Sequence, residues 1–149
     1  MLSLKNIFLN LFLTLLVFSL TAYGDSKNIV PDIQGTLIWQ DNVKTAFVLA
    51  QKEQKIVMVM VEDIRCRWCI KMKEGALSDI EVQKNLQQYI LLKIDRGDNK
   101  SMESLPGLRG PIPSFHFFTA KKRSIDKIAG YYESEDFLGY IKEIAEDEL

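Results

Sequence analysis

The strongest structural signal in this chain lies in residues 56–69, which read IVMVMVEDIRCRWC. The first six of these residues form an unbroken apolar run of β-branched residues and methionine. Such a run is typical of a strand buried on both faces of a helix-covered sheet. Residues 62–65 then turn the chain, and Cys66 opens the next segment. We therefore predict a strand, a turn and a helix, with Cys66 and Cys69 at the start of the helix.

The flanking residues predict further helices and strands. Helices are expected behind a cap at Asp41 with the apolar face Val43, Ala46, Phe47 and Ala50, behind a capping box of Ser78 and Glu81, and behind a cap at Ser134. Strands are expected at 89–95, 113–119 and 124–130, with one short helix in the polar segment 96–110, whereas residues 25–38 lead into the fold. This order predicts an α/β sandwich in which helices flank a central mixed sheet on both faces.

The first 24 residues have the pattern of a secretory signal peptide. Lys5 precedes an apolar stretch at 7–20, and Ala22-Tyr23-Gly24 supplies small residues where a signal peptidase would cleave. The apolar stretch is shorter than the roughly 20 residues that a membrane-spanning helix needs. We expect a signal peptide at 1–24 and one mature domain at 25–149, with an uncleaved membrane anchor as the alternative.

Composition narrows the function classes. The 149 residues carry a net charge of -1, with basic and acidic residues interleaved, so no nucleic-acid-binding surface is expected. The chain has only two cysteines, both in one C-x-x-C. A bridge across so short a loop removes little entropy from the unfolded chain, which makes a purely stabilising role a poor explanation for the pair.

The position of the C-x-x-C indicates redox chemistry. Cys66 at a helix N-terminus faces unpaired backbone N–H groups that favour a thiolate, and Arg67, with Arg65, adds positive charge beside it. Cys69 follows one turn later on the same face, where it can attack a mixed disulfide formed at Cys66. A zinc site would need about four ligands, and the chain adds only the single histidine His116. An inert local disulfide is the other alternative.

Several separate motifs carry a resemblance to a known family. They are the strand followed by Cys66-x-x-Cys69, LSDIEVQ at 77–83, RGPIPS at 109–114, and AGY at 129–131 followed by EDFL at 135–138. These motifs resemble the thioredoxin superfamily, and within it the bacterial periplasmic thioredoxin-like (thiol:disulfide interchange) proteins. The resemblance covers about Ile56 to Ile144 and implies a thioredoxin fold.

The resemblance also implies roles for a second loop and for the residue between the cysteines. Pro113 matches the family's cis-proline, which packs opposite the cysteines. Ile112 then takes the position whose backbone pairs with the substrate chain. Trp68 is expected to be either an exposed contact surface for partners or a side chain packed on the loop.

The family's buried acid, six residues before the first cysteine, is missing because Met60 stands there. Glu62 lies on the same strand face by the period of two, and it either substitutes for that acid or ends the strand in solvent. Glu74 is a weaker candidate. His116 is expected to be a sheet residue rather than a catalytic base.

The expected function is thiol–disulfide exchange in the periplasm, without metal, nucleotide or flavin. Cys66 is the expected nucleophile and Cys69 the resolving thiol, with Trp68, Ile112 and Pro113 binding substrate and with Arg67 and Glu62 tuning the centre. The resemblance implies a monomeric reductase of protein disulfides that receives electrons from an inner-membrane donor. The alternatives are a disulfide oxidase or isomerase, and a binding or assembly module that keeps the fold.

Overall fold

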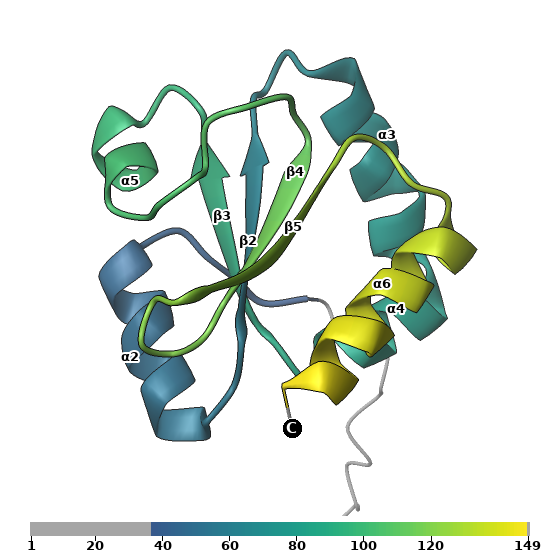
Figure 1. Ribbon diagram of the computed structural model, residues 1–149. Helices are drawn as coiled ribbons and strands as arrows, with labels where there is room; N and C mark the ends of the chain where they lie inside the picture. Colours follow the sequence, from purple (N-terminus) through teal and green to yellow (C-terminus); the bar gives the residue numbers. More distant parts are fainter. Residues whose placement is uncertain (1–36, 149) are drawn as a thin grey trace, which may run out of the picture. The chain divides into compact units, whose positions relative to one another are not determined.

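Five strands form one mixed sheet in the computed structural model, which describes residues 37–148. The strands are β1 (Trp39–Gln40), β2 (Val57–Glu62), β3 (Ile90–Asp95), β4 (Ser114–Phe118) and β5 (Ser124–Ala129). They lie in the order β1-β3-β2-β4-β5, as Figure 1 shows for the four longer strands. β3 runs parallel to β1 and β2, whereas β4 runs antiparallel to β2 and β5. The expected mixed sheet is confirmed, with the apolar run at its centre.

Helices cover both faces of this sheet. They are α2 (Val43–Glu53), α3 (Arg67–Glu74), α4 (Ile80–Leu86), α5 (Asn99–Glu103) and α6 (Ser134–Asp147), with a 3-10 turn at Ala76–Ser78. The even-numbered residues of β2 face α3, α4 and α6, and the odd-numbered ones face α2 and α5 (Figure 1). All six residues of β2 are buried, as a strand covered on both faces requires. None of the helices within residues 37–148 is long and apolar enough to cross a membrane.

Three helix caps differ from the expected residues, each by one position. Asn42, not Asp41, caps α2, and its side chain accepts the backbone N–H three residues on. Asp79, not Ser78, caps α4 with its carboxylate, while the Ser78 hydroxyl donates to the carbonyl of Lys73 over 2.6 Å. The N-cap is the residue whose side chain reaches the first free backbone N–H groups of the helix. Asp, Asn and Ser have similar N-cap preferences, so the sequence does not decide between two such neighbours.

The same one-residue shift occurs at the last helix, and one strand was not expected at all. The N-cap of α6 is Glu133, and Ser134 is already helical. β1 follows the lead-in segment and pairs in parallel with Leu91 and Leu92 of β3. A two-residue edge strand has no periodicity of its own, so only its partner strand reveals it. The expected signal peptide lies outside the described residues.

The topology brings two distant segments to one edge of the sheet. β2 and β4 are antiparallel, with Val61 opposite Ser114, so the end of β2 lies beside the start of β4. Cys66 follows the end of β2, and Pro113 immediately precedes β4. The peptide bond between Ile112 and Pro113 is cis.

Candidate active site

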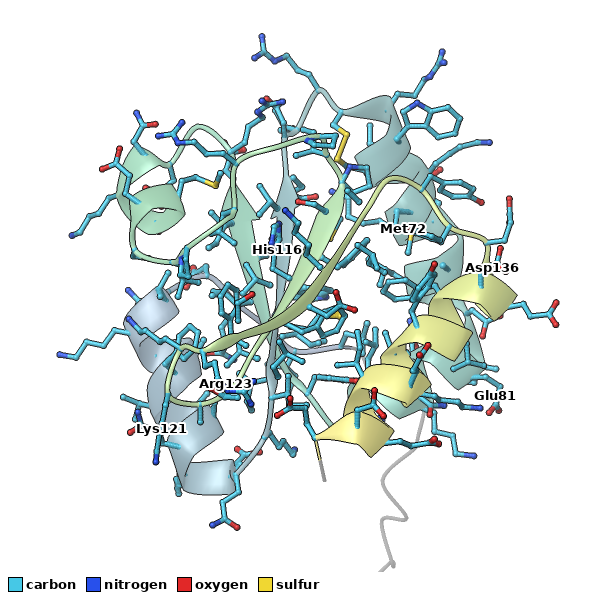
Figure 2. All side chains as sticks on the ribbon, in the orientation of Figure 1. Met72, Glu81, His116, Lys121, Arg123 and Asp136 are labelled. Atoms are coloured by element: carbon cyan, nitrogen blue, oxygen red, sulfur yellow. A yellow bond between two sulfur atoms is a disulfide. The ribbon has the colours of Figure 1, made fainter. Side chains whose placement is uncertain are left out.

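The two cysteines occupy unequal positions at the start of α3. Cys66 is the N-cap, with extended backbone angles, and its sulfur accepts a hydrogen bond from the N–H of Cys69 over 3.1 Å. The two residues are joined by a disulfide, which is the yellow bond at the start of α3 in Figure 2. Cys66 is half-buried, whereas Cys69 is fully buried within the core cluster. Only one of the two sulfurs therefore belongs to a residue that an incoming partner can reach.

Asp63 fixes the turn that delivers Cys66. Its carboxylate accepts the N–H of Arg65 over 2.8 Å, and this bond holds the pKa of Asp63 below its ordinary value. The carbonyl of Asp63 in turn accepts the N–H of Cys66 over 2.9 Å. The sequence predicted a turn at residues 62–65, but Glu62 is the last residue of β2. An aspartate two residues before the bonded amide is the turn signal that could have identified this role.

The loop before β4 begins beside the end of the strand that leads to Cys66. Pro113 is buried and Ile112 half-buried, while the extra proline Pro111 is exposed. The carbonyl of Pro113 accepts the N–H of Gly130 over 2.8 Å, which ties the loop to the end of β5. Ile112 and Cys66 pack against the same core cluster, and the two segments that carry them leave neighbouring strands where Val61 pairs with Ser114.

Glu62 does not end the strand in solvent, which was one of the two alternatives expected for it. Its side chain is nearly buried at the end of β2, and its carboxylate lies 2.7 Å from the ammonium of Lys73 and 3.9 Å from that of Lys93. Met60, on the same strand face, is fully buried and apolar. Glu74 is exposed at the end of α3. Of the two carboxylates expected as substitutes for the missing acid, Glu62 is largely buried and ion-paired, whereas Glu74 is exposed.

Trp68 is both exposed and packed. Its side chain is 47% exposed beside the cysteines, so it is available to a partner. Its ring also lies 5.6 Å from that of Tyr131, in the segment between β5 and α6. The ammonium of Lys71 is within 5.3 Å of the tryptophan ring centre and 5.4 Å of the tyrosine ring centre, and the guanidinium of Arg67 is 5.9 Å from the tryptophan. Tyr131 and Lys71 were not among the expected site residues. Tyr131 is distant from α3 in the chain, and only the tertiary fold brings its ring against that of Trp68.

His116 is a buried residue of β4, as expected. Its Nε2 lies 2.9 Å from the hydroxyl of Ser114, two residues before it on the same face. Burial, with a smaller contribution from Lys127, lowers the pKa of His116 from 6.5 to about 4. The imidazole is therefore neutral at pH 7. Within residues 37–148, no group of three or more histidine, cysteine or acidic side chains is arranged to hold a metal.

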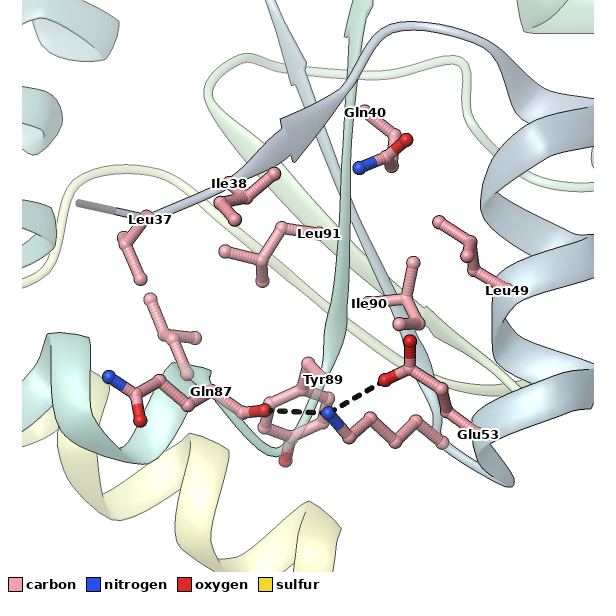
Figure 3. Close-up of a pocket in the computed structure, with 11 residues that line it drawn as sticks. Leu37, Ile38, Gln40, Leu49, Glu53, Gln87, Tyr89, Ile90 and Leu91 are labelled. Carbon is pink, nitrogen blue, oxygen red and sulfur yellow. Dashed lines mark hydrogen bonds and ion pairs between the residues drawn. The ribbon is translucent and has the colours of Figure 1, made fainter. Parts of the chain in front are cut away.

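A separate groove lies at the opposite edge of the sheet. It has a volume of about 400 Å³ and is lined by β1, by α2 and by the start of β3, including Leu49, Tyr89 and Ile90 (Figure 3). Lys55 crosses one side of it, with its ammonium 3.0 Å from the Glu53 carboxylate and 3.1 Å from a backbone carbonyl. Ile90 pairs with the first residue of β2, whereas the cysteines follow the last, so this groove is remote from the disulfide.

Comparisons with known structures show the thioredoxin fold. A thioredoxin from Thermus thermophilus superimposes with a TM-score of 0.66 at 23% identity, covering 74% of this chain and 88% of that chain. A DsbH oxidoreductase superimposes with a TM-score of 0.67 at 15% identity, covering 83% and 94%. The reduced C-terminal domain of DsbD from Neisseria meningitidis gives 0.59 at 21% identity, covering 71% and 98%. The expected fold class is confirmed.

Sequence comparison identifies the family. None of the curated proteins shows significant sequence similarity to the chain. The family model Thioredox_DsbH, described as a protein of unknown function, DUF255, matches residues 23–105. This match includes the central strand and both cysteines, and it ends before the loop that contains Pro113. Since it covers more than half of the chain, the protein belongs to the Thioredox_DsbH family of thioredoxin-like proteins.

Proposed function

We propose that this protein is a thiol–disulfide oxidoreductase in which Cys66 attacks and Cys69 resolves. One observation carries the proposal: within a thioredoxin fold, a half-buried cysteine caps α3 and is bonded to a fully buried cysteine one turn later. The N–H of Cys69 already points at the sulfur of Cys66. The same bond, together with the other free amides of the helix start, stabilises a thiolate at Cys66.

The reaction transfers two electrons without a cofactor. The Cys66 thiolate attacks one sulfur of a substrate disulfide, forming a mixed disulfide and releasing a substrate thiolate that takes up a proton. Cys69 loses its proton and attacks the Cys66 sulfur, which releases the second substrate sulfur as a thiol. The substrate disulfide has become two thiols, and the two cysteines have become a disulfide. A dithiol donor then returns the pair to its reduced form by the same exchange.

The loop before β4 is the proposed substrate support. Ile112 packs against the same core cluster as Cys66 and leads into β4 through Pro113. We assign the backbone of Ile112 to pairing with an extended substrate segment, a mode in which main-chain hydrogen bonds supply affinity. Trp68, which lies between the two cysteines in the chain, supplies an exposed aromatic surface. Glu62 is assigned to receiving the proton of Cys69, because it is the largely buried carboxylate at the end of the strand beneath α3.

The proposed direction of electron flow is reduction. Arg67 is exposed, and one partly solvated charge contributes about 1 kcal/mol, which changes the potential of a two-electron couple by only about 20 mV. Such a shift does not turn a thioredoxin-like centre into a strong oxidant. We place the mature domain, residues 25–149, in the periplasm, where an inner-membrane donor would keep it reduced. The pattern of residues 1–24 supports export.

Insulin reduction by the purified protein tests the activity. Catalytic amounts should accelerate precipitation of reduced insulin in the presence of a dithiol, and Cys66→Ser should abolish this. Cys69→Ser should instead accumulate mixed disulfides, because the resolving thiol is missing.

Acid-quenched alkylation of cells tests the direction of electron flow. A pool that is mainly dithiol supports a reductase, whereas a pool that is mainly disulfide in wild-type cells and is unaffected by loss of the membrane donor would indicate an oxidase.

A further inference from the structure

We propose that Arg67, Trp68, Lys71 and Tyr131 form a recognition surface for acidic protein segments, and that this surface selects substrates with a carboxylate next to the reactive cysteine. This surface is called the cation–aromatic patch below. The inference rests on the proposed thiol–disulfide exchange and adds its substrate class.

The patch is ordered by contacts within the protein. Trp68 and Tyr131 lie with their ring centres 5.6 Å apart, and the Lys71 ammonium is 5.3 and 5.4 Å from those centres. A cation over an aromatic face is attracted by the ring electrons and keeps its N–H donors for other partners.

The patch also carries uncompensated positive charge. Residues 65–73 include four basic residues and no acidic one, although the whole chain has a net charge of -1. Two of the four are engaged, Arg65 with Asp63 at 3.6 Å and Lys73 with Glu62 at 2.7 Å. No carboxylate of residues 37–148 lies within 4 Å of the basic groups of Arg67 or Lys71.

One acidic residue does face the patch. Glu133 is exposed, and its interaction with the Tyr131 hydroxyl raises the pKa of that tyrosine. Within residues 37–148, Glu133 makes no ion pair with Lys71 or Arg67 within 4 Å, so both cations keep their donors for a partner. Glu74, the other nearby acid on α3, is exposed at the far end of the helix.

The position of these groups defines the partner. Arg67 is adjacent to Cys66 in the chain, and Lys71 lies one turn further along α3 beside the exposed face of Trp68. When the sulfur of a substrate chain reaches Cys66, the substrate residues next to that sulfur therefore lie beside two cations and an aromatic surface. An extended protein segment with an acidic side chain beside its cysteine fits these groups, whereas a basic segment meets like charge.

Three synthetic peptides test this directly. They are identical except that the residues flanking their single cysteine are Glu, Gln or Lys, and each cysteine is activated as a mixed disulfide with pyridine-2-thiol. The fully reduced protein attacks the peptide sulfur and releases pyridine-2-thione, whose absorbance gives the second-order rate constant. At low ionic strength we expect the Glu peptide to react about tenfold faster than the Lys peptide, with the ratio falling as salt is added.

Matched variants assign the preference to the patch. Arg67→Glu combined with Lys71→Glu should reverse the order of the Glu and Lys peptides. Lys44→Glu combined with Lys52→Glu makes the same charge change on α2, which covers the other face of the sheet, and should leave the order unchanged. Equal rates for the Glu and Lys peptides with the wild-type protein would overturn this recognition surface alone. No reaction with any peptide would overturn the proposed exchange and the surface with it.

Discussion

The ammonium of Lys73 lies 2.7 Å from Oε2 of Glu62, and this ion pair joins α3 to the last residue of the central strand. The side chain of Glu62 is nearly buried. Less than half of the surface of the Lys73 side chain is exposed, and its ammonium reaches the carboxylate from α3. The pair therefore links the helix that carries both cysteines to the sheet beneath it.

Removing the lysine should destabilise the fold. Lys73→Met leaves a largely buried carboxylate without its nearest cation, and we expect a loss of about 1–2 kcal/mol in the free energy of unfolding. Chemical denaturation of the oxidised protein measures this. Arg109→Met breaks an exposed pair with Glu103 at 3.4 Å and should cost no more than about 0.5 kcal/mol. Equal losses in both variants would contradict the structural importance of the Glu62 pair.

Glu62→Gln tests the assignment of this carboxylate to the proton of Cys69. The amide cannot accept that proton as a carboxylate does, so resolution of the mixed disulfide should slow by about tenfold or more at neutral pH. At alkaline pH, where Cys69 ionises without help, the rates of wild type and variant should converge. Stopped-flow measurement of the second step across pH checks this. A rate deficit that is the same at every pH would indicate a structural effect only.

The two cysteines should differ in reactivity. In the reduced protein, iodoacetamide at mildly acidic pH should modify Cys66 well before Cys69, because Cys66 is half-buried at the helix N-cap and Cys69 is fully buried. Peptide mass spectrometry of briefly labelled protein locates the modification. The Cys66→Ser variant is the control and should remain largely unlabelled over the same time. Comparable labelling of the two residues would argue against their assigned roles.

His116 should make stability depend on pH in an acidic window. Its pKa is lowered from 6.5 to about 4 by burial, so between these values the unfolded chain binds a proton that the folded chain does not. Stability contributed by the neutral imidazole is therefore complete above pH 6.5 and falls as the pH drops towards 4, by about 2–3 kcal/mol in total. In the His116→Gln variant, the midpoint of chemical denaturation should depend less on pH across this window. Because the chain has no other histidine, an unchanged slope would refute the assignment.

The sequence predicted the elements whose signals are local. The apolar run of β2 and the C-x-x-C after it are continuous in the chain, and their structure follows from burial and from helix capping. The caps at Asn42 and Asp79 were missed because the residue before each can also cap, and only the final backbone decides which side chain reaches the amides. β1 was missed because two residues carry no pattern.

The centre was predicted less completely, for a different reason. Cys66 and Cys69 share one motif, but the ion pair of Glu62 with Lys73 crosses from strand to helix and has no signature in the sequence. The contact of Tyr131 with Trp68 joins residues far apart in the chain, so it appears only when α6 and β5 have been placed beside α3. Long-range packing of this kind is set by the topology rather than by any local pattern.

The two cysteines and the proposed substrate support are brought into place by different kinds of contact, because β4 must pair with β2 to position the support. The cysteines can meet as soon as one helical turn forms, since they are three residues apart. The segment around Ile112 is positioned by the pairing of β4 with β2, two strands that are distant in the chain, and such pairing must first close a long loop. The proposed thiol pair is thus assembled by contacts within one helical turn, whereas the proposed substrate support depends on pairing between distant segments.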